Sequence, residues 1–176
     1  MKLPQPFTKD KTVINVVIET PKNSRSKYTY DEKGDFFKLS KILPEGLAFP
    51  LHFGFIPYTK GGDGDPLDVL VLMDEPAFTG CIAECRLVGT LVADQTEKNK
   101  TTRNDRIIAV AVESPRYNKV NSIQDLDKTM VREIINFMKY YNKMAGKEFR
   151  VLRYLDGSKT LEMIQRKIEK KKKAGT

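Results

Sequence analysis

The sequence predicts one α+β domain, in which a small, closed or partly open β-barrel is followed by two helices. Short β-rich runs fill most of the chain before residue 115, and a clear helical periodicity begins only after it. Most connections between the runs are short and rich in Gly, Pro, Asn or Asp. A run of strands followed by helices is typical of an α+β fold. With 176 residues, the chain is long enough to bury a core of its own.

The predicted strands are runs rich in β-branched and aromatic residues. The first reads Val-Ile-Asn-Val-Val-Ile, at residues 13–18. Residues 44–66 carry four prolines and five glycines, so we expect a long loop there, and loops of that length are usually functional. The further predicted strands are Lys27–Tyr30, Phe36–Leu39, Leu67–Met73, Ile82–Ala93, Arg106–Val112 and Phe149–Tyr154.

Two helices are predicted near the C-terminus. Gly146 is placed to end the first helix, because glycine readily adopts the left-handed backbone of a helix C-terminus. The second helix follows Gly157, and residues 166–176 form a basic tail that we expect to be flexible. The apolar stripes that predict the two helices are Leu126, Met130, Ile134, Met138 and Tyr141, and then Leu161, Ile164 and Ile168.

Composition and charge exclude several classes of protein. Residues 166–173 hold six basic side chains against one acidic one, so this segment contributes +5 of the net charge of +8, and we predict no nucleic-acid partner. No apolar run approaches the roughly 18 residues that span a bilayer. The N-terminus lacks the apolar region of a signal peptide, so we expect a cytoplasmic protein without a membrane partner.

Cys81 and Cys85 suit buried free thiols, and two cysteines with one histidine make no convincing zinc site.

Three aspartates within six residues are the most informative feature of the chain. They lie in the run Asp63-Gly64-Asp65-Pro66-Leu67-Asp68, directly before an apolar stretch. Carboxylates this close repel one another, and a hard divalent cation with oxygen ligands would offset that repulsion. An acidic surface turn is the alternative, since Asp, Gly and Pro are common in turns. Asp68 argues against it, because an unpaired carboxylate inside a strand is costly.

Other kinds of catalytic site find no support in the sequence. His52 is the sole histidine, no Gly-x-Ser-x-Gly turn is present, and no Gly-x-x-x-x-Gly-Lys-Ser/Thr loop is present. Further charged residues lie beside the predicted strands, and each alone is typical of solvated surface. Together they describe a site for metal ions and a strongly anionic substrate. The acids are Glu19, Asp94, Glu97 and Asp105, and the bases are Lys27, Lys41, Arg106 and Lys143.

Several motifs together resemble the family I soluble inorganic pyrophosphatases. Asp63-Gly64-Asp65-Pro66-Leu67-Asp68-Val69 fits the aspartate signature of that family at every position, and the resemblance extends roughly from Val13 to Arg153. The other similar segments are Val17-Ile18-Glu19-Thr20-Pro21-Lys22-Asn23, Lys27-Tyr28, the aromatic loop from Phe49 to Pro57, Cys85-Arg86-Leu87-Val88-Gly89, Ala109-Val110-Ala111-Val112, and Tyr141 with Lys143.

The resemblance implies a fold, a reaction and an assembly. The fold would be a five-stranded barrel of the oligonucleotide-binding type with helices packed outside it, forming a single inorganic pyrophosphatase domain over residues 1–176. The reaction would be the Mg²⁺-dependent hydrolysis of pyrophosphate to two orthophosphates by a metal-activated water. Several Mg²⁺ ions would bind in each site, with Mn²⁺ or Zn²⁺ as substitutes. We expect a homo-oligomer, with a hexamer favoured.

The resemblance also implies roles for residues of this chain. Asp65 would orient the attacking water or accept its proton. Glu19 would reach another metal ion through water. The metal ligands would be Asp63, Asp68 and a later acid, for which Asp94, Glu97 and Asp105 are candidates. The phosphoryl groups would be bound by Lys27, Lys41, Arg106, Tyr141 and Lys143.

The chain departs from the family pattern at several positions. Thr29 stands where the family usually has a carboxylate, Phe53 replaces a tyrosine, and Ser40-Lys41 replaces an Asp-Arg pair. Lysine keeps the charge but lacks the guanidinium fork that binds phosphate in a bidentate manner. Residues 94–105 are longer than usual, and an ungapped alignment places Asn104 where an acidic ligand is expected. We interpret the chain as a divergent branch that retains activity.

Two alternatives stay open at this stage. A barrel of this type with a basic tail could bind single-stranded nucleic acid, although three acids on one loop would repel phosphate in the absence of metal. The departures at Thr29, Ser40 and Phe53 also allow a catalytically inactive binder of pyrophosphate or metal.

Overall fold

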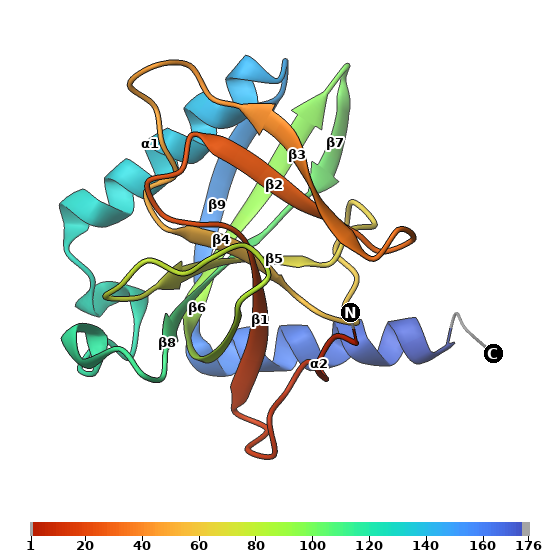
Figure 1. Cartoon of the computed structure of the whole chain (residues 1–176), viewed down its shortest axis with the longest axis vertical. Coiled ribbons are helices and arrows are strands. Elements are labelled where there is room, and N and C mark those ends of the chain that lie inside the picture. The colour runs from red at the N-terminus through yellow and green to blue at the C-terminus, as the bar shows by residue number, and fades with distance from the viewer. Residues whose placement is uncertain (1, 174–176) are drawn as a thin grey trace.

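The computed structural model describes the backbone of residues 2–173 and the side chains of residues 2–168 (Figure 1). Within this part, neither helix combines the length and the apolar composition that a membrane crossing needs. The two helices are α1 (Lys128–Met144) and α2 (Gly157–Lys173). The strands are β1 (Val13–Thr20), β2 (Ser26–Asp31), β3 (Phe36–Ile42), β4 (His52–Ile56), β5 (Leu67–Leu72), β6 (Ile82–Glu97), β7 (Lys100–Arg103), β8 (Arg106–Ala111) and β9 (Glu148–Asp156).

Five strands form a closed ring, which confirms the predicted α+β fold with a small barrel. The order is β1-β4-β5-β8-β6, and β6 pairs with β1 to close it. The β5–β8 pair is parallel, and the other pairs of the ring are antiparallel. Strands β7 and β9 both pair with β6. The β2–β3 hairpin is a separate two-stranded sheet that lies across one end of the ring, while α1 and α2 lie outside it (Figure 1).

The two helices pack against two different apolar clusters. Strand β5 contributes to both clusters because its successive side chains point to opposite faces. Leu70 and Leu72 lie in the cluster that includes Ile134 of α1. Val69 and Val71 lie in the cluster that includes Ile164 of α2. Burial on both faces explains why this strand is a continuous apolar run apart from Asp68.

The helix termini follow local signals. The side chain of Asp127 accepts hydrogen bonds from the backbone N–H groups of Thr129 (2.8 Å) and Met130 (3.1 Å), so it caps the N-terminus of α1. Gly146 has a φ of 73° just beyond the helix, as predicted. Helix α2 extends through residues 166–173 of the predicted basic tail. Residues 174–176 lie outside the described residues, so the flexibility of the tail stays a prediction.

Two strands were missing from the predictions. Strand β4 lies inside the predicted loop of residues 44–66, which was therefore wrong for this part. Gly54 lets β4 approach β1 closely, because a Cβ atom at this position would lie 2.3 Å from the carbonyl oxygen of Val17. His52 has a structural role at the start of β4: its Nδ1 accepts the backbone N–H of Lys22 at 3.1 Å. Strand β7 is polar and pairs with the extended end of β6.

Candidate active site

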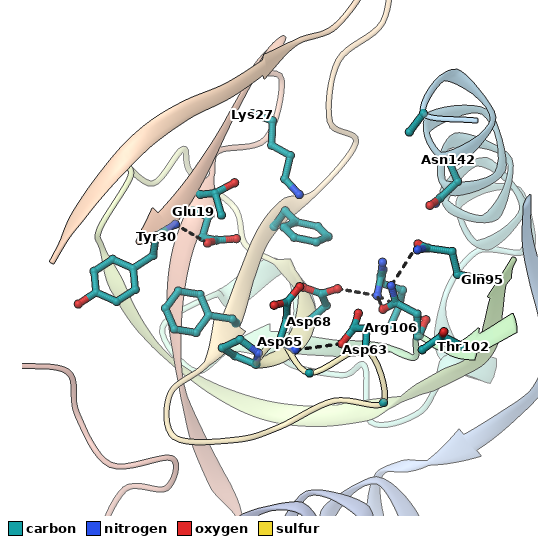
Figure 2. Close-up of a pocket in the computed structure, with 18 of the residues that line it drawn as sticks. Glu19, Lys27, Tyr30, Asp63, Asp65, Asp68, Gln95, Thr102, Arg106 and Asn142 are labelled. Atoms are coloured by element: carbon teal, nitrogen blue, oxygen red, sulfur yellow. Dashed lines mark hydrogen bonds and ion pairs between the residues drawn. The ribbon is translucent and has the colours of Figure 1, made fainter. Parts of the chain in front are cut away.

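A cavity of about 1070 Å³ lies between the β2–β3 hairpin, the aspartate loop before β5, the β6–β8 strands and the end of α1. Figure 2 shows the three aspartates on one side, Lys27 pointing toward them from β2, and Gln95, Thr102 and Asn142 on the other side. The predicted site residues that line the cavity are Glu19, Lys27, Lys41, Asp63, Asp65, Asp68, Glu97, Arg106 and Tyr141.

The aspartate loop is a tight turn stabilised by its own hydrogen bonds. The carboxylate of Asp63 accepts the backbone N–H of Asp65 at 3.2 Å, and the carbonyl of Asp65 accepts the backbone N–H of Gly61 at 2.6 Å. Gly64 has a φ of 99°, a conformation that side chains disfavour. Partial burial and the neighbouring charge of Asp63 raise the pKa of Asp65. Both carboxylates are exposed and line the cavity.

Asp68 has a cationic partner within the protein. Its carboxylate lies 2.6 Å from a guanidinium nitrogen of Arg106, and the side chains are 21% and 5% exposed. Burial raises the pKa of Asp68, and the positive charge of Arg106 opposes that rise. The guanidinium lies near two aromatic rings, 5.9 Å from the centroid of Phe53 and 5.7 Å from that of Phe149. A carboxylate inside a strand thus has the positive neighbour that its burial requires.

Glu19 is the most buried acid of the cavity. It lies near the end of β1, is 7% exposed, and accepts the backbone N–H of Tyr30 at 2.7 Å. Burial raises the pKa of Glu19 to about 7, while the hydrogen bond from Tyr30 and the charge of Lys27 oppose the rise. This carboxyl group therefore changes its charge near neutral pH.

Aromatic rings support the cations on the hairpin side of the cavity. The amine of Lys27 lies 4.9 Å from the centroid of Phe53 and 5.6 Å from that of Tyr141. The amine of Lys41 lies 5.1 Å from the centroid of Tyr141. Phe53, which replaces a family tyrosine, therefore keeps the ring that supports Lys27 and loses only the hydroxyl.

Three predicted site residues do not line the cavity. Asp94 lies 3.3 Å from the guanidinium Nε of Arg103. Asp105 accepts the backbone N–H of Ala93 at 3.0 Å and lies 4.0 Å from the same guanidinium. Lys143 is exposed on α1. Side chains of successive residues in extended backbone point to opposite sides. Asp94 and Asp105 therefore point away from the cavity, whereas their neighbours Gln95 and Asn104 line it.

The cavity is lined instead by polar residues that the sequence did not single out, although the ungapped alignment pointed to Asn104. The amide of Asn104 donates to the side-chain oxygen of Gln95 at 3.2 Å and accepts from Arg106. The amine of Lys147, another of these residues, lies 3.3 Å from the carboxylate of the predicted residue Glu97. The alternation of sides along β6 and β7 was the signal that could have identified Gln95 and Thr102. The lining residues in question are Gln95, Thr102, Asn104, Asn142 and Lys147.

Residues 16–172 match the family model described as inorganic pyrophosphatase. The chain belongs to the inorganic pyrophosphatase family. This membership confirms the family and the enzyme class that the sequence motifs predicted.

Relatives of the family agree in sequence and in structure. The chain is 38% identical to the inorganic pyrophosphatase of Halalkalibacterium halodurans, over 86% of this chain and 91% of the relative. It is 36% identical to the inorganic pyrophosphatase of Synechocystis, over 87% of this chain and 88% of the relative. The inorganic pyrophosphatase of Thermus thermophilus has a similar structure, with a TM-score of 0.87, 33% identity and coverage of 97% of both chains. The fold of the chain is thus that of inorganic pyrophosphatases.

Proposed function

We propose that this inorganic pyrophosphatase family member hydrolyses pyrophosphate to two orthophosphates in the cavity, and that the reaction depends on Mg²⁺. One observation carries the proposal: the carboxylates of Asp63 and Asp65 share a cavity with the cations of Lys27, Lys41 and Arg106. Carboxylates alone would repel a pyrophosphate anion, and cations alone would bind it without activating water. A cavity that holds both suits a strongly anionic substrate together with a divalent cation.

The donor atoms near the aspartate loop fit a hard cation. Asp63 and Asp65 offer exposed carboxylate oxygens on a preformed turn, and Mg²⁺ prefers one or two such ligands and keeps several waters. Asp63 and Asp68 would therefore hold the ion, Glu19 would contact it through water, and Asp65 beside them would stay available to the attacking water. When bound, the cation would neutralise charge on the phosphoryl oxygens and make a water molecule easier to deprotonate.

Other residues of the cavity would activate the attacking water and bind the phosphoryl groups. Asp65 would orient the attacking water and accept its proton, because a water bound to the cation needs only a weak base. Lys27 and Lys41 would bind phosphoryl oxygens, because both amines lie above aromatic rings that leave their N–H donors free to point into the cavity. Tyr141 would add a hydroxyl donor. Lys147 lines the cavity and would supply the cation expected of Lys143.

The decisive experiment measures phosphate release from pyrophosphate with and without Mg²⁺. We expect release that requires the metal and that EDTA abolishes. No release at any Mg²⁺ or Mn²⁺ concentration would instead favour the inactive binder, a candidate supported by Asn104 in the position of an expected acidic ligand. A cytoplasmic location and a homo-oligomer, with a hexamer favoured, stay predictions. Chromatography with light scattering measures the size of the assembly.

A further inference from the structure

The β2–β3 hairpin presents two lysines to the cavity from directly opposite positions. Lys27 and Lys41 are Cα partners in this antiparallel pair, and both line the cavity. Like charges that face each other across two strands destabilise the pair. Both amines also lie near one ring, because that of Lys27 is 5.6 Å and that of Lys41 is 5.1 Å from the centroid of Tyr141. An anion bound beside the two amines would offset their repulsion.

Lys41 is the cation of this hairpin that is most available to a phosphoryl oxygen. Lys27 points toward the three aspartates (Figure 2). Lys38, which also lines the cavity, lies 2.9 Å from the carboxylate of Asp31. Lys41 forms no ion pair with a carboxylate of the described residues. The direction in which Lys41 points therefore matters for the binding of an anion.

A β-bulge at Ser40 determines that direction. Lys27 lies opposite Lys41. The next pair along the strands is Tyr28 with Leu39, so Ser40 is an extra residue without a partner in the ladder. In a regular ladder, Ser40 would lie opposite Lys27, and Lys41 would point to the other face of the hairpin. The bulge therefore brings Lys41 to the face that lines the cavity.

Two hydroxyl groups connect the bulge to the neighbouring strand. The hydroxyl of Ser40 donates to the carbonyl oxygen of Lys27 at 3.1 Å, and it accepts the hydroxyl of Thr29 at 3.0 Å. Both positions depart from the family pattern, in which carboxylates are usual. Two charged carboxylates could not share such a hydrogen bond, because neither has a proton to donate. The departures at Thr29 and Ser40 are thus coupled to each other in the structure.

We propose that Ser40, supported by Thr29, is a positioning residue that stabilises the bulge and thereby directs Lys41 toward a phosphoryl group of the substrate. This inference deepens the proposed function and rests on it for Lys41 as a ligand of the phosphoryl groups. The two departures from the family pattern then act as one change, in which a pair of hydroxyls sets the register of the hairpin.

Calorimetric titration of the whole chain with methylenediphosphonate in the presence of Mg²⁺ tests the inference. This analogue of pyrophosphate has a carbon atom in the bridging position, so binding is measured without turnover. Ser40→Ala should weaken binding about three- to tenfold, the range expected for the loss of one or two hydrogen bonds. Ser40→Thr keeps the hydroxyl and should retain the affinity of the wild type.

A double-mutant cycle shows whether Ser40 acts through Lys41. Lys41→Ala should weaken binding at least as much as Ser40→Ala does. When Lys41 is already alanine, Ser40→Ala should cause no further loss, because the bulge then has no amine to direct. Losses that add in the double variant would show that Ser40 acts independently of Lys41 and would overturn the inference.

Two further variants make the test independent of how well Ser40→Ala folds. Thr29→Val keeps the shape of the side chain and removes its donor to Ser40, so it should also weaken binding, with Lys41 present but not in its absence. Ser26→Ala is the matched control on the same strand, since the hydroxyl of Ser26 makes no hydrogen bond among the described residues, and it should bind like the wild type.

The outcomes separate this inference from the proposed reaction. Wild-type binding in folded Ser40→Ala and Thr29→Val, together with weaker binding in Lys41→Ala, would overturn the inference alone. Unchanged binding in Lys41→Ala would overturn it as well. A chain whose variants bind the analogue as expected but which releases no phosphate from pyrophosphate would refute the proposed reaction and leave the role of Ser40 standing.

Discussion

Glu19 allows a quantitative prediction about stability and pH. Its pKa is about 7 in the folded protein against an ordinary value of 4.5, a difference of about 2.5 units. The unfolded chain thus loses the Glu19 proton before the folded protein does, and the free energy of unfolding falls as the pH rises from about 4.5 through 7. At 1.36 kcal/mol per unit, the charged carboxylate destabilises the folded protein by about 3 kcal/mol above that range.

The variant Glu19→Gln removes this charge and keeps an oxygen that can accept the N–H of Tyr30. In EDTA, we expect the variant to gain about 3 kcal/mol over the wild type between pH 4.5 and about pH 8.5, measured by urea denaturation at each pH. Glu84→Gln, at an exposed position of β6, is the control, and its difference from the wild type should stay constant within about 0.5 kcal/mol. A Glu19→Gln difference that does not vary with pH would refute the reasoning.

Three further predictions concern activity and packing. Asp65→Asn should lower the rate of phosphate release by about 100-fold or more with an unchanged melting temperature, and near-normal turnover would exclude this residue as the proton acceptor. Ile164→Ala should cost about 2–5 kcal/mol in urea denaturation, because Ile164 is fully buried between α2 and the ring, whereas the exposed Lys159→Ala should change stability little. Gly54→Ala should destabilise the β1–β4 pair, since its Cβ would lie 2.3 Å from a backbone oxygen, and wild-type stability would show that the strands can separate there without cost.

Local patterns predicted much of the fold. The strands around Val13 and Leu67 and the helix with Ile134 are confirmed because each has a periodicity that its own sequence reveals. Strand β4 could not be recognised in the same way. Its Gly54 and the prolines around it indicate a loop locally, and the reason for the glycine is the backbone of β1, which lies far away in the sequence.

The candidate site could be predicted in outline but not in detail. The aspartate run is a local signal, so Asp63, Asp65 and Asp68 were found from the sequence. Whether Asn104 or Asp105 faces the cavity depends on the register in which β6 and β8 pair. A shift of one residue in that register would exchange the two side chains. The pairing of Asp68 with Arg106 likewise depends on the parallel β5–β8 contact.

The closure of the ring also has a consequence for how the chain folds. Strand β1 closes the ring by pairing with β6, and Val13 lies opposite Arg86 in that pair. One edge of β1, the first strand to be synthesised, therefore has no hydrogen-bond partner until β6 has formed. Pairing across such a long loop is slow, because the loss of chain entropy precedes the gain in contacts. During synthesis, β1 therefore keeps an unpaired edge until β6 has left the ribosome, and this interval is when the chain is most exposed to aggregation.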